Sequence, residues 1–279
     1  MSVNVLYILL ILIGYFGTLA IIPLFKNMLI NSNIVRPNYK GDMIPVSMGI
    51  VFIPMMVINS IITVFVGRYF RMFSNTSLVC LFAFIFGLAS MFFAGIMDDV
   101  IGNRDVSGLK GHFKSLLKGS LTTGGFKALF GGFVGILISL VASNNIWELM
   151  INTLIIALST NLMNLLDLRP GRAIKGYLFT TLVMCLTLTG FIRVLPLLLL
   201  PSVLAYFNAD LKAKAMMGDA GSNVLGISIG IIMVFGYSFN VRLCWLVFLI
   251  LIHLLTEKYS LTKIIENNKL LNFIDKLGR

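Results

Sequence analysis

Long uncharged apolar runs alternate along the chain with short polar segments. A helix needs about 20 residues to cross a hydrocarbon core of about 30 Å. Counting the runs that approach this length predicts about nine transmembrane helices, and therefore an all-α polytopic integral membrane protein. The predicted helices cover residues 4–25, 46–67, 78–97, 127–143, 148–166, 176–191, 194–209, 221–238 and 241–256. Residues 1–256 are expected to form a single transmembrane domain.

The composition agrees with this pattern. Hydrophobic residues make up 58% of the chain and charged residues only 12%, whereas a soluble domain carries about 25% charged residues. The formal net charge of +11 would suit either nucleic acid or anionic lipid as a partner. Because the basic residues lie in short segments between apolar runs, nucleic acid is not expected, and lipid headgroups or phosphorylated substrates are.

The lysines and arginines also predict an orientation. Of the 22 basic residues, only Arg68, Arg71, Arg193 and Arg242 fall on one side of the predicted spans. By the positive-inside rule, the side that carries the others faces the cytoplasm. The N-terminus is then outside and the C-terminus cytoplasmic, in a multi-pass protein of the cell membrane.

Residues 257–279 have a different pattern. Apolar residues recur at helical spacing, and lysines and acids occupy the positions between them. This pattern predicts a cytoplasmic amphipathic helix that lies on the inner leaflet. A docking surface for a partner is the alternative.

Three acidic motifs stand at the ends of apolar runs, all on the predicted cytoplasmic side. Asp98 and Asp99 end the third run, Asp167 ends the fifth, and Asp219 precedes the eighth. An ionised carboxylate is costly in hydrocarbon, so these groups must meet water or a cation. Mg²⁺ is usually held by one or two carboxylates and substrate phosphate oxygens. The motifs therefore predict a magnesium–phosphate site, in which the adjacent Asp98 and Asp99 have different roles.

Other polar residues near these motifs are candidate ligands for substrate. Asn161, Asn164 and Asp167 form a polar stripe on an apolar helix, which should face the protein interior or a cavity. The segment Gly218-Asp219-Ala220-Gly221-Ser222 begins a predicted helix, where free backbone N–H groups can seat a phosphate. Asp42, Asp105 and Asp210 are interpreted as solvated loop charges.

Together these motifs resemble one family. The ordered set is Asp98-Asp99, Asn161-x-x-Asn164-x-x-Asp167 and Met217-Gly218-Asp219-x-Gly221-Ser222, preceded by Arg36-Pro37-Asn38 and Pro45. It resembles the polyprenyl-phosphate N-acetylhexosamine-1-phosphate transferases, which include phospho-N-acetylmuramoyl-pentapeptide transferase and undecaprenyl-phosphate N-acetylglucosamine-1-phosphate transferase. The resemblance extends from about residue 36 to residue 230.

The resemblance implies a reaction and a set of roles. It implies Mg²⁺-dependent transfer of a sugar-1-phosphate from a nucleotide-diphospho-sugar, typically a UDP-sugar, to a polyprenyl phosphate for cell-envelope glycans such as peptidoglycan. Asp219 would bind Mg²⁺, and Asp98 and Asp99 would bind metal or assist the lipid phosphate. Asn164 and Asp167 would line the donor site. The remaining candidate substrate ligands are Lys127, Asn161, Gly218, Gly221, Ser222, Arg36 and Lys40, of which Arg36 and Lys40 could instead only set topology.

The chain departs from the family pattern in three ways. Leu168-Arg169-Pro170-Gly171 follows Asp167, so that proline replaces a second acid that the family uses in donor recognition. A histidine-rich loop near the C-terminus is absent, and the chain has one span fewer than usual. Arg169 and Arg172 are then candidate ligands for the donor phosphates.

Two other classes of function stay open at this stage. A transporter could use membrane acids, although these should lie near mid-bilayer beside broken helices. A non-catalytic relative could act as a lipid-binding or scaffold protein, which would explain the departures. A homodimer is also compatible with the sequence.

Overall fold

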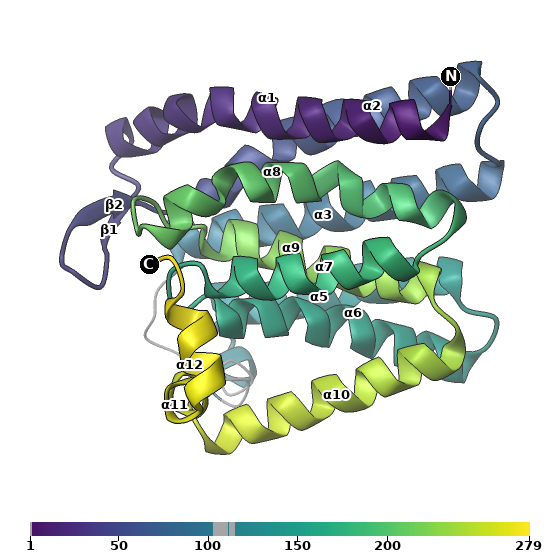
Figure 1. The fold of residues 1–279 in the computed structure, drawn as a ribbon. Helices are drawn as coiled ribbons and strands as arrows, with labels where there is room; N and C mark the ends of the chain where they lie inside the picture. Colours follow the sequence, from purple (N-terminus) through teal and green to yellow (C-terminus); the bar gives the residue numbers. More distant parts are fainter. Residues whose placement is uncertain (1, 103–110, 112–114) are drawn as a thin grey trace.

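The computed structural model describes residues 2–102, 111 and 115–279, and these form a bundle of long helices (Figure 1). The long helices are α1 (Val3–Asn31), α2 (Phe52–Tyr69), α3 (Asn75–Ile101), α5 (Thr123–Ala142), α6 (Ile146–Leu166), α7 (Arg172–Thr187), α8 (Val194–Leu211), α9 (Gly218–Gly236) and α10 (Phe239–Lys258). The shorter elements are β1 (Val35–Pro37), β2 (Met43–Pro45), the 3₁₀ helices η1 (Met48–Val51) and η2 (Gly190–Arg193), α11 (Leu261–Asn267) and α12 (Lys269–Lys276).

The all-α polytopic fold is confirmed. Each of the nine predicted apolar runs coincides with a helix, and eight helices in the described residues are long and apolar enough to cross a membrane. The remaining run, α7, has 16 residues and is about 24 Å long at 1.5 Å per residue. The N-terminus lies at one end of the bundle, and the β1–β2 hairpin and the C-terminus lie at the other (Figure 1). The cytoplasmic orientation of that second end stays a prediction.

Helix α9 forms the centre of the bundle. Its residues from Ala220 to Val234 are all buried, and it packs mainly against α3 and α6. Small residues make this contact close, since a Cβ atom on Gly230 would lie 2.8 Å from the Cα atom of Ile156 in α6. Close approach at small residues is the usual way in which membrane helices associate. The element that carries Asp219 is therefore held on several sides.

The segment between the first two long helices contains an antiparallel hairpin, where the sequence predicted a loop. β1 pairs with β2 in the register Val35 to Pro45. The side chain of Asn38 shapes the turn, because its Oδ1 accepts hydrogen bonds from the backbone N–H groups of Lys40 (2.8 Å) and Asp42 (3.0 Å). Gly41 has a φ of +90°, which glycine adopts readily.

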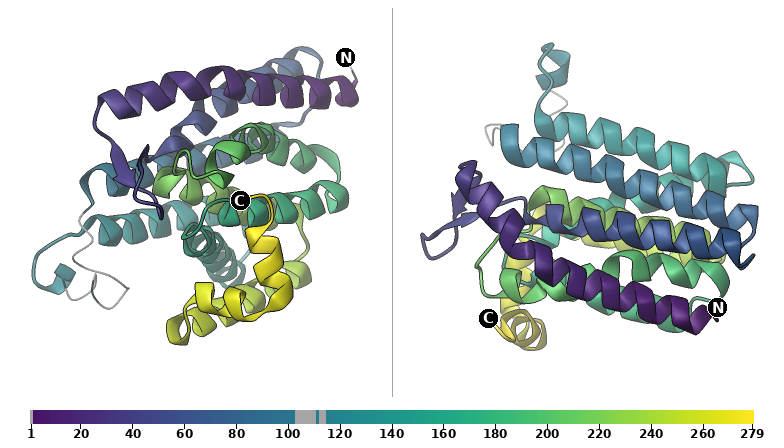
Figure 2. Two further views of the ribbon diagram at one scale, coloured as in Figure 1. Left: turned by 60° about the vertical axis from the view of Figure 1, so that its left-hand side comes forward. Right: turned by 90° about the horizontal axis from the view of Figure 1, so that it is seen from above.

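The tail forms two short helices where the pattern predicted one. The break falls at Asn268, whose side chain accepts a hydrogen bond from the N–H of Leu271 at 3.0 Å and so caps α12. Asn is a favoured residue at a helix N-terminus for this reason. In Figure 1 and in the right-hand view of Figure 2, α11 and α12 lie at the same end of the bundle as the hairpin.

Candidate active site

Three charged side chains from three helices converge at this end of the bundle. The ammonium group of Lys127, in the first turns of α5, lies 2.9 Å from Oδ2 of Asp98 at the end of α3. It also donates a hydrogen bond to Oδ2 of Asp219 in the first turn of α9. The side chains of Lys127, Asp98 and Asp219 are 20%, 20% and 31% exposed, so that each can be reached from outside. The structure thus brings the carboxylates of Asp98 and Asp219 together at the ammonium group of Lys127.

Asp99 is placed differently from its neighbour Asp98. It is 7% exposed, and its Oδ1 and Oδ2 accept hydrogen bonds from the N–H groups of Asp219 and Ala220, both at 3.0 Å. Ser47 Oγ donates a third hydrogen bond to Oδ2 at 2.9 Å. A carboxylate at a helix N-terminus satisfies free N–H groups and interacts favourably with the helix dipole. Asp99 therefore caps α9 and positions Asp219.

This cap changes the interpretation of the Met-Gly-Asp-x-Gly-Ser motif. Two of the N–H groups in the segment that was expected to seat a phosphate, those of Asp219 and Ala220, already bind Asp99. Gly218 has a φ of +72°, and a Cβ atom there would lie 3.0 Å from Cγ of Asp99. A Cβ atom on Gly221 would lie 3.0 Å from Cα of Gly49 in η1. Both glycines are thus required for close packing around the cap.

The polar stripe on α6 is divided between two environments. The side chain of Asn164 donates a hydrogen bond to Oδ1 of Asn223 at 2.7 Å and accepts one from the hydroxyl of Ser222, which links α6 to α9. Asp167 follows the last turn of α6 and lines a cavity. Asn161 is exposed on α6 and does not line this cavity.

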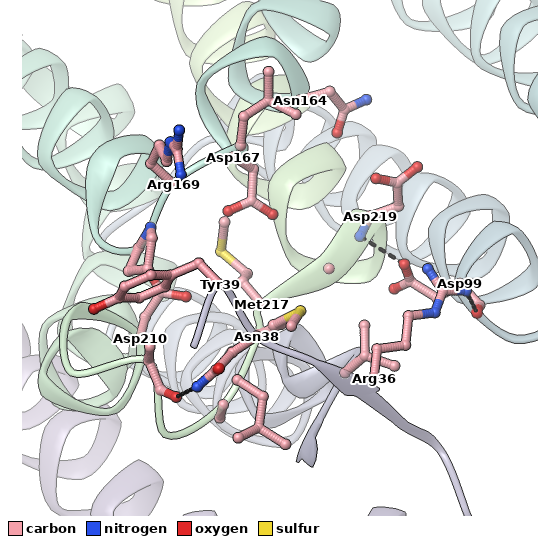
Figure 3. A pocket seen from close by; sticks show the side chains of 18 residues that line it. Arg36, Asn38, Tyr39, Asp99, Asn164, Asp167, Arg169, Asp210, Met217 and Asp219 are labelled. Carbon is pink, nitrogen blue, oxygen red and sulfur yellow. Dashed lines mark hydrogen bonds between the residues drawn. The ribbon is translucent and has the colours of Figure 1, made fainter. Parts of the chain in front are cut away.

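The cavity has a volume of about 250 Å³ and lies between the hairpin, the end of α6 and the start of α9. Figure 3 shows Asp167 between Asp219 on one side and Arg169 and Asp210 on the other. Removal from water, together with the carboxylates of Asp210, Asp219 and Asp99, raises the pKa of Asp167 well above its usual range. One side of the cavity therefore carries several carboxyl groups, and the neutral form of Asp167, which the raised pKa favours, can donate a hydrogen bond as well as accept one.

Asp210 is a residue that the sequence interpretation missed. It is not a solvated loop charge: it is 4% exposed, lines the cavity, and accepts a hydrogen bond from the N–H of Gly171 at 2.7 Å. The signal was present, because Asp210 ends an apolar run just as Asp98 and Asp167 do. Asp42 is exposed, as expected, and Asp105 lies outside the described residues.

Of the basic residues predicted to bind substrate, some line the cavity and others do not. Arg36 lines the cavity, and its guanidinium donates a hydrogen bond to the backbone oxygen of Asp99 at 2.6 Å. Arg169 also lines the cavity. Lys40 is exposed at the hairpin turn, with its amine 5.5 Å from the ring centre of Tyr39, and does not line the cavity. Arg172 is buried against the tail, where it pairs with Asp275.

The donor atoms of the site suit a hard cation with few protein ligands. Within the described residues, no three His, Cys, Asp or Glu side chains are grouped as metal ligands. Asp98 and Asp219 nevertheless offer two carboxylates to the single cation of Lys127. One or two carboxylates are what Mg²⁺ takes from a protein when substrate phosphates supply other oxygens, whereas a structural zinc site needs four ligands. The residues therefore fit Mg²⁺.

Comparison with known proteins agrees with the geometry. No match to a curated protein was found. The family model described as glycosyl transferase family 4 matches residues 81–237, which is more than half of the chain and includes Asp98, Lys127, Asp167 and Asp219. The chain therefore belongs to glycosyl transferase family 4, the family of polyprenyl-phosphate hexosamine-1-phosphate transferases.

Proposed function

We propose that this membrane-embedded transferase moves an N-acetylhexosamine-1-phosphate from a UDP-sugar to undecaprenyl phosphate in a Mg²⁺-dependent reaction at the cytoplasmic face of the cell membrane. Family membership gives the coarser activity, the transfer of a sugar phosphate to a polyprenyl phosphate. The observation that carries the proposal is the convergence of Asp98, Lys127 and Asp219 from three helices.

The charge pattern of the site supports a diphosphate substrate. Phosphoryl transfer depends mainly on positioning and on neutralising charge, with little covalent participation by the protein. Asp98 and Asp219 would hold Mg²⁺, which when bound offsets negative charge on phosphate oxygens. Arg36 adds a positive charge to the cavity lining, and Lys127, which is not part of the lining, pairs with Asp219, which is. Asp99 holds α9 so that the carboxylate of Asp219 keeps its position.

The bonding changes need no protein nucleophile. A phosphate oxygen of the lipid acceptor forms a bond to the sugar-linked phosphorus of the donor. The bond between that phosphorus and the bridging oxygen breaks, and nucleoside monophosphate leaves. A phosphate monoester has a second pKa of about 6, so the acceptor is already ionised at neutral pH. No residue of the chain has to remove a proton.

The cavity also supports an orientation for the donor. Its phosphates would lie near Lys127 and Arg36, away from the carboxylates of Asp167 and Asp210. Those carboxylates accept hydrogen bonds and would suit the hydroxyl and N–H groups of the nucleoside or sugar. Asn38 lines the same cavity, but its amide is engaged within the protein, because Nδ2 donates to Asp42 and to the backbone oxygen of Ala213 and Oδ1 accepts from the turn.

The test is transfer of radiolabel from several nucleotide-sugars to undecaprenyl phosphate, by the purified protein in lipid nanodiscs, with Mg²⁺ or with EDTA. We expect a lipid-linked product with at least one donor, and only with Mg²⁺. Asp98→Asn and Asp219→Asn should each lower the rate by about 100-fold or more, the usual cost of removing one group that stabilises transition-state charge. Glu257→Gln, an exposed acid after the last span, is the matched control.

Two outcomes would contradict the proposal. If none of the donors gives a product, the protein is better explained as a non-catalytic relative of the family. Product formation that is unchanged in both aspartate variants would show that the reaction does not use this site.

A further inference from the structure

The C-terminal tail is docked by a set of buried charges onto the bundle. Arg172, at the start of α7, donates from Nε to Oδ1 of Asp275 at 2.8 Å and from NH2 to Oδ2 at 3.0 Å. Both side chains are nearly inaccessible, at 5% and 6% exposed. The third nitrogen of the guanidinium donates to Oγ1 of Thr262 in α11 at 3.0 Å. Two-point pairing of this kind fixes the relative orientation of the two elements.

Two more basic side chains complete the docking. The amine of Lys175 donates to the backbone oxygens of Ile274, Asp275 and Leu277 at 2.9, 2.8 and 2.8 Å, which caps the end of α12. Arg279 pairs with Asp275 at 2.8 Å and donates from Nε to the backbone oxygen of Pro170 at 2.8 Å. The last residue of the chain thus contacts the segment that follows α6.

That segment, residues 167–171, is part of the cavity wall. Asp167, Leu168, Arg169 and Pro170 all line the cavity. On its inner side, the N–H of Gly171 is bound by Asp210 of α8. On its outer side, Arg279 binds the oxygen of Pro170, and Arg172 follows Gly171 directly. Residues 167–171 are therefore held by hydrogen bonds from two directions, from Asp210 in α8 and from Arg279 in the tail.

We propose that Arg172, Asp275 and Arg279, here called the tail clamp, are positioning residues for donor binding. The proposal rests on the proposed function, because it assigns the cavity lined by residues 167–170 to the nucleotide-sugar. Arg172 acts by holding the tail against the wall of the cavity, and it does not touch the donor itself. In the described part of the chain, no hydrogen bond or ion pair joins the tail clamp to Asp98, Lys127 or Asp219, so we expect it to affect the donor and to leave the acceptor phosphate unaffected.

A purely structural role for these charges makes a different prediction. Buried ion pairs often add little net stability, and removing one partner leaves an uncompensated charge that destabilises the whole protein. Such a loss would lower the amount of folded enzyme and would leave the KM of both substrates unchanged. Donor KM, compared with acceptor KM and kcat, therefore separates positioning from stability.

The experiment uses the full chain in nanodiscs and three tail variants. Asp275→Asn removes the central carboxylate of the clamp. Arg279→Ala removes the contact with Pro170 and leaves Asp275 paired with Arg172, so we expect a smaller loss of stability than in Asp275→Asn. Lys276→Ala is the matched control, since the exposed side chain of this neighbour makes no hydrogen bond or ion pair in the described part of the chain.

A second control addresses loss of stability. Glu148 and Arg242 form an equally buried ion pair at the start of α6, about 30 Å along that helix from Asp167. Glu148→Gln should lower the thermal stability and leave the donor KM unchanged. A clamp variant that acts only through loss of stability would resemble Glu148→Gln, with a lower thermal stability and an unchanged donor KM.

Two measurements decide the proposal. Steady-state kinetics should show a donor KM raised by about 10- to 100-fold in Asp275→Asn, within the range that a shift of up to 1 Å in binding groups produces. Arg279→Ala should show a smaller rise, and the acceptor KM should change by less than about twofold, which is below 0.5 kcal/mol. Hydrogen exchange by mass spectrometry should show faster exchange in residues 167–171 of both variants without substrate.

An unchanged donor KM, or unchanged exchange in residues 167–171, in both clamp variants would overturn the proposal. So would an equal rise in donor KM in Glu148→Gln. If the wild-type protein forms no product with any donor, the proposed function fails. Hydrogen exchange then still reports whether the tail holds the segment.

Discussion

Substitution by asparagine should affect mainly the activity at Asp98 and mainly the stability at the adjacent Asp99. Asp99 is buried and accepts two backbone hydrogen bonds from α9, whereas Asp98 is partly exposed and pairs with Lys127. We expect Asp99→Asn to lower stability strongly. We expect Asp98→Asn to lower activity by about 100-fold or more with little change in stability.

The magnitude for Asp99 follows from its contacts. An asparagine can present its single carbonyl oxygen to only one of the two N–H groups, and its NH₂ group then faces the other donor. The lost hydrogen bond to a charged acceptor costs about 1.5–3 kcal/mol. Loss of negative charge at the start of α9 adds up to about 2 kcal/mol. At about 2–4 °C per kcal/mol, the expected fall in Tm is near 10 °C.

The expected loss of stability in Asp98→Asn is smaller. Its pair with Lys127 is accessible to solvent, and such pairs contribute about 1 kcal/mol or less. Lys127 also keeps Asp219 as a partner when Asp98 is replaced. The expected fall in Tm is therefore within about 4 °C.

The assay is thermal unfolding of the purified protein in detergent, followed with a thiol-reactive dye in a background that carries Cys185→Ser and Cys244→Ser, so that the dye reports exposure of the buried Cys80. The same preparations are assayed for transfer of radiolabelled sugar phosphate. Equal falls in Tm for Asp98→Asn and Asp99→Asn would refute the assignment of different roles. An unchanged Tm in Asp99→Asn would refute the helix cap.

Three further predictions concern neighbouring features. Lys127→Met should abolish transfer and weaken binding of the nucleotide-sugar, measured by isothermal titration, because the phosphates lose a positive charge while Asp98 and Asp219 remain; Lys127→Arg should restore part of the binding. Gly95→Ala should lower both Tm and kcat, since a Cβ atom at Gly95 would lie 2.7 Å from the backbone nitrogen of Ala220, and an unchanged kcat would contradict this. Burial raises the pKa of Asp275, but the hydrogen bonds and charges of Arg172 and Arg279 outweigh it and lower this pKa below its usual value. Docking of the tail should therefore contribute stability above a pH of about 3.9 and lose it as the pH falls through the lower folded-state pKa, which hydrogen exchange across a pH series would detect.

Much of the fold was predictable because apolar length is a local property. Every run that could span a bilayer forms a helix, and the ends of these runs fall within a few residues of the observed helix ends. The same local rule placed Asp98, Asp167 and Asp219 at helix ends. The sequence also predicted that these three residues lie near one another, because the positions of the predicted spans put all three motifs on one side of the membrane.

The rest depended on contacts between distant residues. The helices are apolar around most of their circumference, so the sequence did not indicate which face meets a neighbour. Arg172 pairs with Asp275, and the N–H of Gly171 binds Asp210. Both partners are distant along the chain, so no helical or strand periodicity could have indicated them. The hairpin was missed because each strand has only three residues, the last of which is a proline. The division of the tail rests on one capping asparagine, Asn268.

The central burial of α9 has a consequence for how the enzyme can move. Its side chains are enclosed along nearly their whole length, so opening this helix would require much of the bundle to separate. Asp219 then behaves as a fixed reference point for the reaction. Adjustment to an arriving substrate then has to come from the periphery, where the hairpin of residues 35–45 projects from one end of the bundle (Figure 1). Adaptability and chemistry are thereby assigned to different parts of one molecule.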